Sequence, residues 1–511
     1  MPEVLVALYP FVPVLAVAIS AVAAVVILVL PEDARRVRTT VNLTAALAKL
    51  GLLLAVVPFV FSGVYPAIGW DLLPGLRLEL RADALSMLFA LLGSILWLAT
   101  TIYAIGYLRD DPHQRRFFSF FSLCVTATVG IAFAGNLVTF VVFYELLTLV
   151  TYPLVSHAGT PAALKAARAY LSYALTGGLL VLTGTVLLQL AAGTTAFEAG
   201  GTDAVAEYAA THPVRSVAIL ALLLVGLGVK AALVPLHGWL PLAMVAPAPV
   251  SALLHAVAVV KAGAFGIVRV VADLFGVEVV SRLGVLDVLL VWACVTILYG
   301  SLRALRATDL KERLAFSTVS QVSYITLGMA MVSATATVGG LVHLFHQGIT
   351  KIVLFFCAGL FAERWGAISI ASLAGLGRRM PWTSAAFTIG AFGMIGLPPL
   401  AGFVTKWTLA QGALNADRPW VVAVLVASAA LNCGYFLPVV IRLWWPPTDG
   451  ADAEADAAAG AAVAEARPIA LKAMLIPTVL VALLSIAAGM FAGLEFSPLG
   501  AAEQIVRGAG R

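Results

Sequence analysis

Charged residues are scarce in this sequence. Only 11% of its 511 residues are Asp, Glu, Lys or Arg, whereas 62% are hydrophobic and the mean hydropathy is +1.02. A soluble protein of this composition would precipitate. Most of the chain consists of apolar runs of about 20 residues, each long enough to cross a bilayer core of about 30 Å as a helix. The sequence therefore predicts an all-α, polytopic membrane protein.

Cysteine pairs and cofactor motifs are also missing. Cys124, Cys294, Cys357 and Cys433 stand singly in apolar segments, so no CxxC metal or redox pair exists. No GxxxxGK[ST] loop, HExxH or GxGxxG between a strand and a helix is present. We therefore expect no metal site, no cofactor and no transport driven by nucleotide hydrolysis. The net charge of +5 is explained by membrane topology rather than by binding of nucleic acid.

The apolar runs predict about fourteen transmembrane helices, centred near residues 17, 52, 95, 125, 146, 178, 225, 262, 294, 322, 349, 398, 432 and 481. The first run lacks a basic n-region and a small-residue cleavage site, so we expect a retained helix rather than a signal peptide.

Basic residues are unevenly divided among the connections. One alternating set of loops carries 18 of them: Arg35, Arg36, Arg38, Arg109, Arg115, Arg116, Lys165, Arg168, Arg303, Arg306, Lys311, Arg313, Arg364, Arg378, Arg379, Arg442, Arg467 and Lys472. The other set carries five: Arg77, Arg81, Arg215, Arg282 and Arg418. The positive-inside rule places the first set in the cytoplasm, and both termini then lie outside the cell.

Proline interrupts two of the predicted helices in similar ways. The seventh helix combines Lys230 with Pro235 and Pro241, and the twelfth combines Lys406 with Pro398 and Pro399. Because these broken helices are five apart, we expect two inverted five-helix repeats, formed by helices 4 to 8 and 9 to 13.

The expected domains follow from these repeats. Residues 1–110 form helices 1 to 3, residues 111–280 the first repeat, residues 281–446 the second repeat, and residues 447–511 an acidic linker with helix 14. The Ala-rich acidic stretch from Pro446 to Pro468 predicts a mobile cytoplasmic segment.

Ionisable side chains inside the predicted helices form the candidate site. A charge at the bilayer centre costs from about 2.5 to more than 10 kcal/mol, so such residues usually have a function. Glu145 lies near the middle of helix 5, Lys230 in helix 7, Lys261 in helix 8 and Lys406 in helix 12. In helix 11, "LVHLFHQGITKIVLFF" adds a polar stripe, whose members are His343, Gln347 and Lys351, with His346 beside them.

Simpler roles must be weighed for some of these residues. Lys49, near the start of helix 2, is expected to be a snorkelling anchor. His255 precedes Lys261 by six positions, which places the two on different faces of an ideal helix, so His255 is an additional candidate together with His343 and Gln347. A Glu145–Lys230 pair would fit a purely structural role, but it would not explain three further lysines.

Proton movement is the chemistry that this set supports. A lysine removed from water loses its proton more readily, and a nearby carboxylate opposes that loss. Glu145 and Lys230 would therefore form a switch. The expected relay stations, linked by water, are Lys261, His346, Lys351 and Lys406. Hard cations prefer oxygen ligands, and Glu145 is the one carboxylate clearly placed inside a helix, so a complete sodium site is not indicated.

These segments resemble the antiporter-like subunits shared by Mrp-type multisubunit cation/proton antiporters and respiratory complex I. The resemblance covers helices 4 to 13. It rests on Glu145, "GVKAALVPLHGWLPLA", "APAPVSALLHAVAVVKAG", "DLKERLAFSTVSQ", "HQGITKIVLFFCAG" and "GLPPLAGFVTKW", and "ADALSMLF" around Asp83 is similar to the family's third-helix start. The resemblance implies a Glu145–Lys230 ion pair, proton relay through Lys261, His346 and Lys351, and an end of the path at Lys406.

The subtype that the chain resembles most is the D-type component of Mrp antiporters, because residue 406 is lysine and the sequence ends after helix 14. This implies a component of a Na⁺/H⁺ antiporter, not an enzyme by itself, in the cell membrane of a prokaryote with other membrane subunits as partners. D-type components of membrane-bound hydrogenases and other complex I relatives are similar too. A proton-pumping module of a redox complex is therefore the alternative, and a structural scaffold is a third reading.

Overall fold

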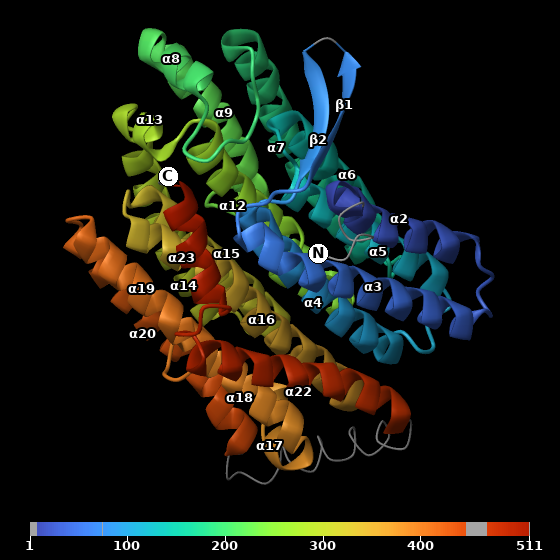
Figure 1. Cartoon of the computed structure of the whole chain (residues 1–511). Helices are drawn as coiled ribbons and strands as arrows, with labels where there is room; N and C mark the ends of the chain where they lie inside the picture. Colours follow the sequence, from blue (N-terminus) through green and yellow to red (C-terminus); the bar gives the residue numbers. More distant parts are fainter. Residues whose placement is uncertain (1–7, 74, 446–467, 510–511) are drawn as a thin grey trace.

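Long helices packed side by side make up nearly all of the protein (Figure 1). The structure is a computed structural model, and it describes residues 8–73, 75–445 and 468–509. Of the acidic stretch expected to be a mobile linker, residues 446–467 lie outside the described residues, and Pro468 begins the last long helix.

Within the described residues, twelve helical segments are long and apolar enough to span a membrane. They are η1 with α2 (Tyr9–Phe11, Val12–Val29), α3 (Arg35–Phe61), α4 (Ala84–Tyr107), α5 (Gln114–Phe133), α6 (Leu137–Val155), α7 (Pro161–Ala192), α9 (Pro213–Lys230), the run Ala248–Leu274, α14 (Val285–Arg306), α16 (Ala334–Trp365), α20 (Pro419–Trp444) and α22 (Pro468–Met490).

Two further predicted helices are present but are too short or too polar to count among these twelve. The helix near residue 322 is α15 (Leu310–Ala330), a 21-residue helix that opens with charged residues and carries several buried hydroxyl groups. The helix near residue 398 is divided into α18 (Pro381–Ile395) and α19 (Ala401–Asn415), each too short to span alone. The polytopic all-helical fold expected from the sequence is confirmed in its main outline.

One departure from an all-α fold precedes the third long helix. Strands β1 (Ala67–Leu73) and β2 (Leu76–Arg81) form an antiparallel hairpin that projects from one end of the bundle (Figure 1). The sequence of β2, "LRLELR", alternates apolar and charged residues, which is the period of a strand with one covered face.

Shorter helices that the sequence analysis did not predict complete the described chain: α8 (Asp203–Thr211), α10 (Trp239–Leu242), η2 (Ala243–Val245), α13 (Val277–Arg282), η4 (Ala371–Leu373), α17 (Leu376–Arg379) and α23 (Pro498–Ala509).

Three long segments are broken inside the bundle. The seventh helix stops at Lys230, the last residue of α9, and resumes only at α10, while the twelfth is interrupted between α18 and α19. Both breaks contain prolines, which lack the N–H that a continuing helix needs. The third break separates α11 (Ala248–Ala256) from α12 (Val259–Arg269), which continues into the π-helical turn η3 (Val270–Leu274).

The break in the eighth helix corrects one expectation. On a continuous ideal helix His255 and Lys261 would lie on different faces, but the chain is not helical at Val257 and Ala258. The predicted separation of His255 and Lys261 onto different faces is therefore wrong. No proline or glycine stands at this break, and the sequence alone gives no sign of it.

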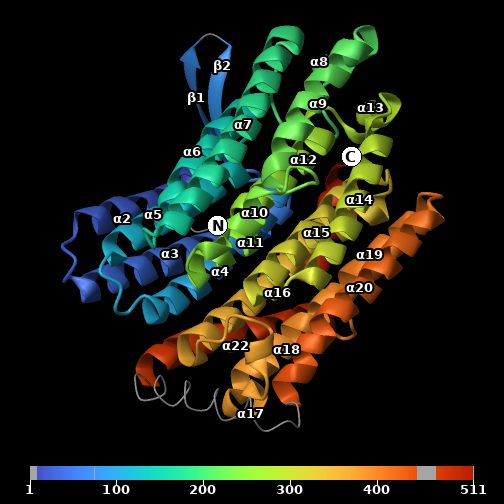
Figure 2. The same ribbon diagram turned by 180° about the vertical axis from the view of Figure 1, so that it is seen from behind.

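Two segments form the centre of the bundle. In α16 and in the run Ala248–Leu274, every residue of the most apolar 18-residue stretch is buried. Both views show α16 in the middle, with α2, α3 and α5 toward one edge and α18, α19 and α20 toward the other (Figures 1 and 2). The last long helix, α22, packs against α4, α16 and α18 and so connects the two edges.

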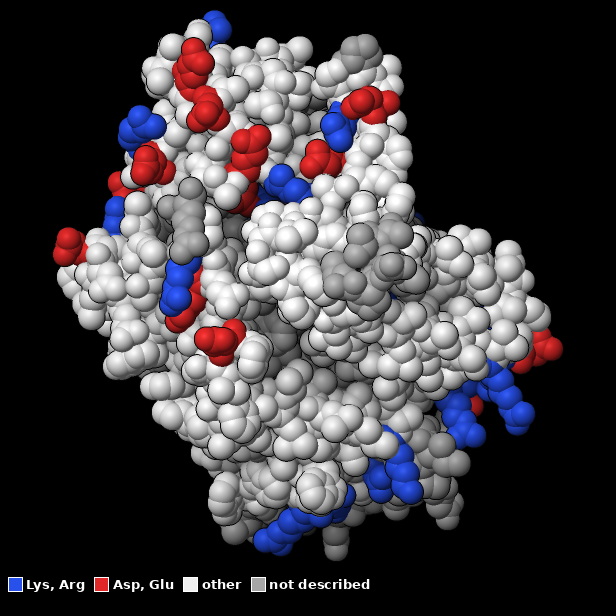
Figure 3. Space-filling view, viewed as in Figure 1, with Lys and Arg blue, Asp and Glu red and all other residues white. Residues whose placement is uncertain are grey.

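Charge is unevenly distributed along the bundle. On the face shown in Figure 3, Lys and Arg dominate the lower end, whereas most of the visible Asp and Glu lie at the upper end. The lower end contains α17, and the hairpin and α8 lie at the upper end (Figure 1).

Candidate functional site

Lys230 occupies the point where α9 stops. Its side chain is buried, and Nζ donates a hydrogen bond to the carbonyl oxygen of Tyr144 on α6. The same ammonium group lies 3.3 Å from the centroid of the Tyr144 ring, so a cation–π contact supports its charge. The contacts of Lys230 are therefore made with the residue that precedes Glu145.

Glu145 lies against α7, within range of a charge interaction with Lys230. A Cβ atom built at Gly178 would approach its Oε1 to 1.7 Å, so only glycine leaves room for this carboxylate. Oε1 is buried and has no hydrogen-bond partner. The ion pairs of the described residues include none between Glu145 and Lys230 within 4 Å, so the pair implied by the resemblance is open in this structure.

Lys261 connects the eighth helix with α16. The side chain is fully buried, and Nζ donates to the carbonyl oxygen of Leu344 over 2.8 Å. The neighbouring Gly263 brings α12 against the end of α9, because a Cβ at this glycine would lie 2.3 Å from the nitrogen of Ala231. Lys261 is thereby held between the break at Lys230 and the central helix.

His255 also faces α16, from the other side of the break in the eighth helix. Its ring is fully buried and lies 4.6 Å from the ring of Phe355, and neither ring nitrogen has a hydrogen-bond partner. Lys351 is close enough to both His255 and Lys261 for their charges to interact. The break thus leaves both side chains near the central helix.

The polar stripe on α16 is buried along its whole length. His343 lies 2.9 Å from the carbonyl oxygen of Gln321, and Lys351 donates to Ser317 over 2.8 Å; both partners belong to α15. The side-chain amide of Gln347 has no hydrogen-bond partner. Buried polar atoms without protein partners are costly, which sets Gln347 apart from the rest of the stripe.

His346 points to the opposite neighbour of α16. Its Nδ1 lies 3.1 Å from the hydroxyl of Thr405 on α19, and Nε2 has no partner. Since Thr405 precedes Lys406, the histidine on α16 contacts the part of α19 that carries the lysine. The stripe therefore divides, with His343 and Lys351 bonded to α15 and His346 bonded to α19.

The proline break explains the position of Lys406. Its Nζ donates to the carbonyl oxygens of Met394, at 2.9 Å, and Ile395, at 2.7 Å, in the last turn of α18. The last carbonyls of a helix have no partner within the helix and carry partial negative charge, so they favour a cation. Interrupting the helix thus creates the acceptor for the ammonium group. Glu145 and Lys406 are partly exposed, whereas the other seven predicted site residues are buried.

Lys49 does not fit its predicted role. It lies near the middle of α3 with no exposed surface, donates to the hydroxyl of Ser20 over 2.5 Å and lies 4.8 Å from the centroid of the Trp97 ring. The snorkelling interpretation is wrong, because α3 begins at Arg35 and places Lys49 several turns from the surface.

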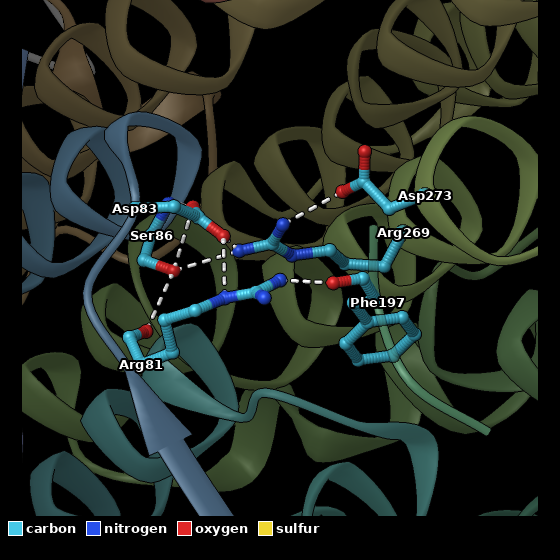
Figure 4. A network of polar contacts seen from close by, with 6 residues as sticks. All are labelled: Arg81, Asp83, Ser86, Phe197, Arg269 and Asp273. Atoms are coloured by element: carbon cyan, nitrogen blue, oxygen red, sulfur yellow. Dashed lines mark hydrogen bonds and ion pairs between the residues drawn. The ribbon is translucent and has the colours of Figure 1, made fainter. Parts of the chain in front are cut away.

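A network of ion pairs closes the opposite end of the eighth helix (Figure 4). Arg269 donates to Asp83 over 2.8 Å, to Asp273 over 2.6 Å and to Ser86 over 2.7 Å. Asp83 caps α4 by accepting from the N–H of Ser86 over 2.8 Å, as its place in "ADALSMLF" suggested. Arg81 at the end of β2 pairs with Asp83 at 3.9 Å.

The Arg269 guanidinium group controls the ionisation of Asp83. Burial by itself raises the pKa of this carboxyl, but the charge and hydrogen bond of Arg269 outweigh burial and hold the pKa below its usual range. A cavity of about 470 Å³ adjoins the network and is also lined by Arg507 of α23. Arg269 and Asp273 were not among the predicted site residues, although their i,i+4 spacing at a helix end was a usable signal.

Residues 134–432 match the family described as "NADH:quinone oxidoreductase/Mrp antiporter, TM", which is more than half of the chain. Residues 75–118 match the family described as the N-terminus of chain 5 of complex I. The chain belongs to this family of antiporter-like membrane subunits. The resemblance inferred from the motifs is confirmed, whereas nothing in these matches distinguishes the D type from the other types.

Known relatives of this antiporter-like subunit belong to both branches of the family. The N component of the NADH-quinone oxidoreductase of Desulforudis audaxviator is 35% identical over 408 residues, 78% of this chain and 79% of that protein. A probable K(+)/H(+) antiporter component of the A/B type, from Rhizobium meliloti, is 33% identical over 356 residues, 68% of this chain but 34% of that longer protein.

Structural comparison extends the likeness to the whole chain. One component of the Mrp complex of a Dietzia species is 25% identical and superimposes with a TM-score of 0.84, covering 98% of this chain and 99% of that chain. The antiporter-like subunit therefore shares its overall fold with an Mrp component.

Proposed function

We propose that the protein is a proton-translocating, D-type subunit of a multisubunit Na⁺/H⁺ antiporter. The observation that carries this proposal is Lys406, whose ammonium group is bound by two carbonyl oxygens that a broken helix exposes. A helix break with a cation at its end is costly in a bilayer, and it provides the place where water and protons would enter.

The other buried groups form the rest of the relay. Glu145 and Lys230 are the switch, and Lys261, Lys351 and His346 are stations between them and Lys406. The bonds of Lys230 to Tyr144 support this proposal, because they give the lysine a second partner when it is not paired with Glu145. Closing the pair would favour the charged form of the lysine, and opening it would favour proton release. His255, His343 and Gln347 line the same centre as additional stations.

The assembly and orientation are part of the proposal. The protein works in the cell membrane of a prokaryote with other membrane subunits, and the partly exposed ends of the line, Glu145 and Lys406, are where neighbouring subunits would continue it. Helices 4 to 8 and 9 to 13 form two inverted repeats, with the domain limits predicted from the sequence. The end of the bundle rich in Lys and Arg faces the cytoplasm, and both termini lie outside.

A proton-pumping role in a redox complex is the second candidate. The observation that favours it is the 35% identity with an NADH-quinone oxidoreductase component across 79% of the length of that relative. The same relay would then move protons in response to electron transfer in partner subunits, without exchange of sodium.

The decisive experiment uses the complete complex in lipid vesicles with a fluorescent probe of internal pH. In the antiporter, addition of sodium changes the internal pH, and Glu145→Ala or Lys230→Ala abolishes the change. Lys49→Met is the matched control, since it also removes a buried lysine but lies outside the proposed line, and we expect transport within about twofold of the wild type. A complex that ignores sodium but acidifies or alkalinises the vesicles when given an electron donor would refute the antiporter assignment.

A further inference from the structure

A chain of buried polar groups joins Lys351 to Lys406 through helices that the proposed relay does not use. Ser317 on α15 accepts from Lys351 over 2.8 Å and lies 3.1 Å from the hydroxyl of Tyr435 on α20. Tyr435 also donates to Oδ1 of Asn432. The Asn432 amide donates over 3.1 Å to the carbonyl oxygen of Met394, the same atom that binds Lys406 at 2.9 Å.

The direction of these hydrogen bonds follows from the donors available. Asn432 directs its NH₂ group to Met394, so its Oδ1 faces Tyr435 and can only accept. The single proton of Tyr435 then points to Asn432, and Ser317 must donate its own proton to Tyr435. Since the ammonium group of Lys351 donates to Ser317, the donors from Lys351 to Asn432 all point away from Lys351. They meet the ammonium group of Lys406 at the Met394 carbonyl oxygen, which accepts from both sides.

The chain of polar groups lies in the interior of the bundle. Ser317, Asn432, Tyr435 and Lys351 have essentially no exposed surface, and apolar residues such as Phe436 pack around them. Hydrogen bonds in such a medium are stronger than in water and polarise one another. Two hydroxyl groups in series are also the simplest side-chain route for a proton, because each hydroxyl can accept one proton while it gives up another.

We propose that the hydroxyl groups of Ser317 and Tyr435 form a proton bridge between Lys351 and Lys406, and that Asn432 is a positioning residue that orients Tyr435. The inference rests on the proposed function, which supplies the two lysines as relay stations. It adds α15 and α20 to the elements that take part in proton transfer.

The proton balance of one transfer is complete. Lys351 gives a proton to Oγ of Ser317, Ser317 gives its own to Tyr435, and Tyr435 gives its own to a water molecule. That water protonates the neutral amine of Lys406, since neither the Asn432 amide nor the Met394 carbonyl can carry the proton onward. At the end Lys351 is neutral, Lys406 is charged, and both hydroxyl groups are restored after rotation.

The test compares two tyrosine variants in the reconstituted complex. Tyr435→Phe removes the bridging hydroxyl and keeps the ring, so we expect the initial rate of proton transport to fall at least about tenfold. Tyr103→Phe is the matched control, because Tyr103 is equally buried and its hydroxyl bonds the Phe356 carbonyl outside the bridge. Its rate should stay within about twofold of the wild type. The amount of assembled complex is measured for each variant.

Ser317 variants exclude a merely structural explanation. Ser317→Ala should reproduce the loss, and Ser317→Thr, which retains a hydroxyl, should restore the rate. The double variant Ser317→Ala with Tyr435→Phe should be no slower than either single variant, because both substitutions break the same route. If the two substitutions acted independently, their fold reductions in rate would multiply. Unchanged transport in Tyr435→Phe, while Lys351→Ala and Lys406→Ala abolish it, overturns the bridge and leaves the relay intact. Unchanged transport in the lysine variants themselves overturns the proposed function.

Discussion

At the scale of single residues, Lys230 and Lys406 are charged groups in segments that are otherwise apolar enough for a bilayer, where each charge is expensive. This cost is large enough that their position in an apolar segment marks both residues in the sequence. Ser317, Tyr435 and Asn432 gave no such signal, since hydroxyl and amide groups are common and inexpensive in membrane helices. Lys49 was misread because distance from the bilayer surface depends on where its helix begins.

Gly178 provides a residue-scale prediction about the switch. A methyl group added there would lie 1.7 Å from Oε1 of Glu145 and must displace the carboxylate, although no ionisable group is removed. A displacement of about 1 Å at a transfer site can reduce a rate up to about a hundredfold. We expect Gly178→Ala to lower the sodium-dependent pH change in vesicles between about tenfold and a hundredfold.

The control for this prediction is Gly51→Ala on α3, where an added Cβ meets no atom within 4 Å. That variant should transport like the wild type. Full activity in Gly178→Ala would mean that the position of the Glu145 carboxylate does not limit transport, and the switch would have to be abandoned.

At the scale of helices and strands, proline determined what could be predicted. The two proline-containing breaks were anticipated, and the break between α11 and α12 was not, because "LLHAVAVVKAG" favours a continuous helix until tertiary contacts with α16 override it. The hairpin was not predicted although β2 alternates with a period of two, because it is short and lies between long apolar runs that favour helices. Arg81 at its end joins the network of Asp83 and Arg269.

Acidification should weaken that network. Because the pKa of Asp83 is held below its usual range, the ion pair contributes fully to stability above the unfolded pKa of about 3.9 and is lost as the pH falls through the folded value. Asp83→Asn keeps a capping side chain for α4 but removes the charge. We expect this variant to unfold at a lower temperature at neutral pH and to show less change on acidification than the wild type, measured by tryptophan fluorescence of the purified complex.

The neighbouring hairpin offers the matched substitution, because Asp71 on β1 is exposed to solvent. Asp71→Asn should leave the midpoint temperature of unfolding, and its dependence on pH, as in the wild type. Identical pH dependence in Asp83→Asn and the wild type would show that another carboxyl group governs acid stability.

At the scale of the whole molecule, the alternation of basic loops agrees with the uneven charge of the folded surface. Orientation in the membrane is set by Lys and Arg close to the helix ends, whichever helices pack together. It can therefore be predicted from the sequence more readily than the contacts between side chains. The central position of α16 could not be predicted in this way. A polar stripe shows only that one face of a helix contacts other helices, and not that the helix lies at the centre of the bundle.

Orientation is therefore the last property to test, with a membrane-impermeant maleimide on intact cells. Glu207 of α8 and Arg378 of α17 are both exposed, on opposite ends of the bundle (Figure 1). Glu207→Cys should react from outside, and Arg378→Cys should react only after the membrane is permeabilised, because positive charge is retained in the cytoplasm. The wild type sets the background, since three of its four cysteines are buried. Labelling of Arg378→Cys in intact cells would reverse the orientation and place the basic end of the bundle outside.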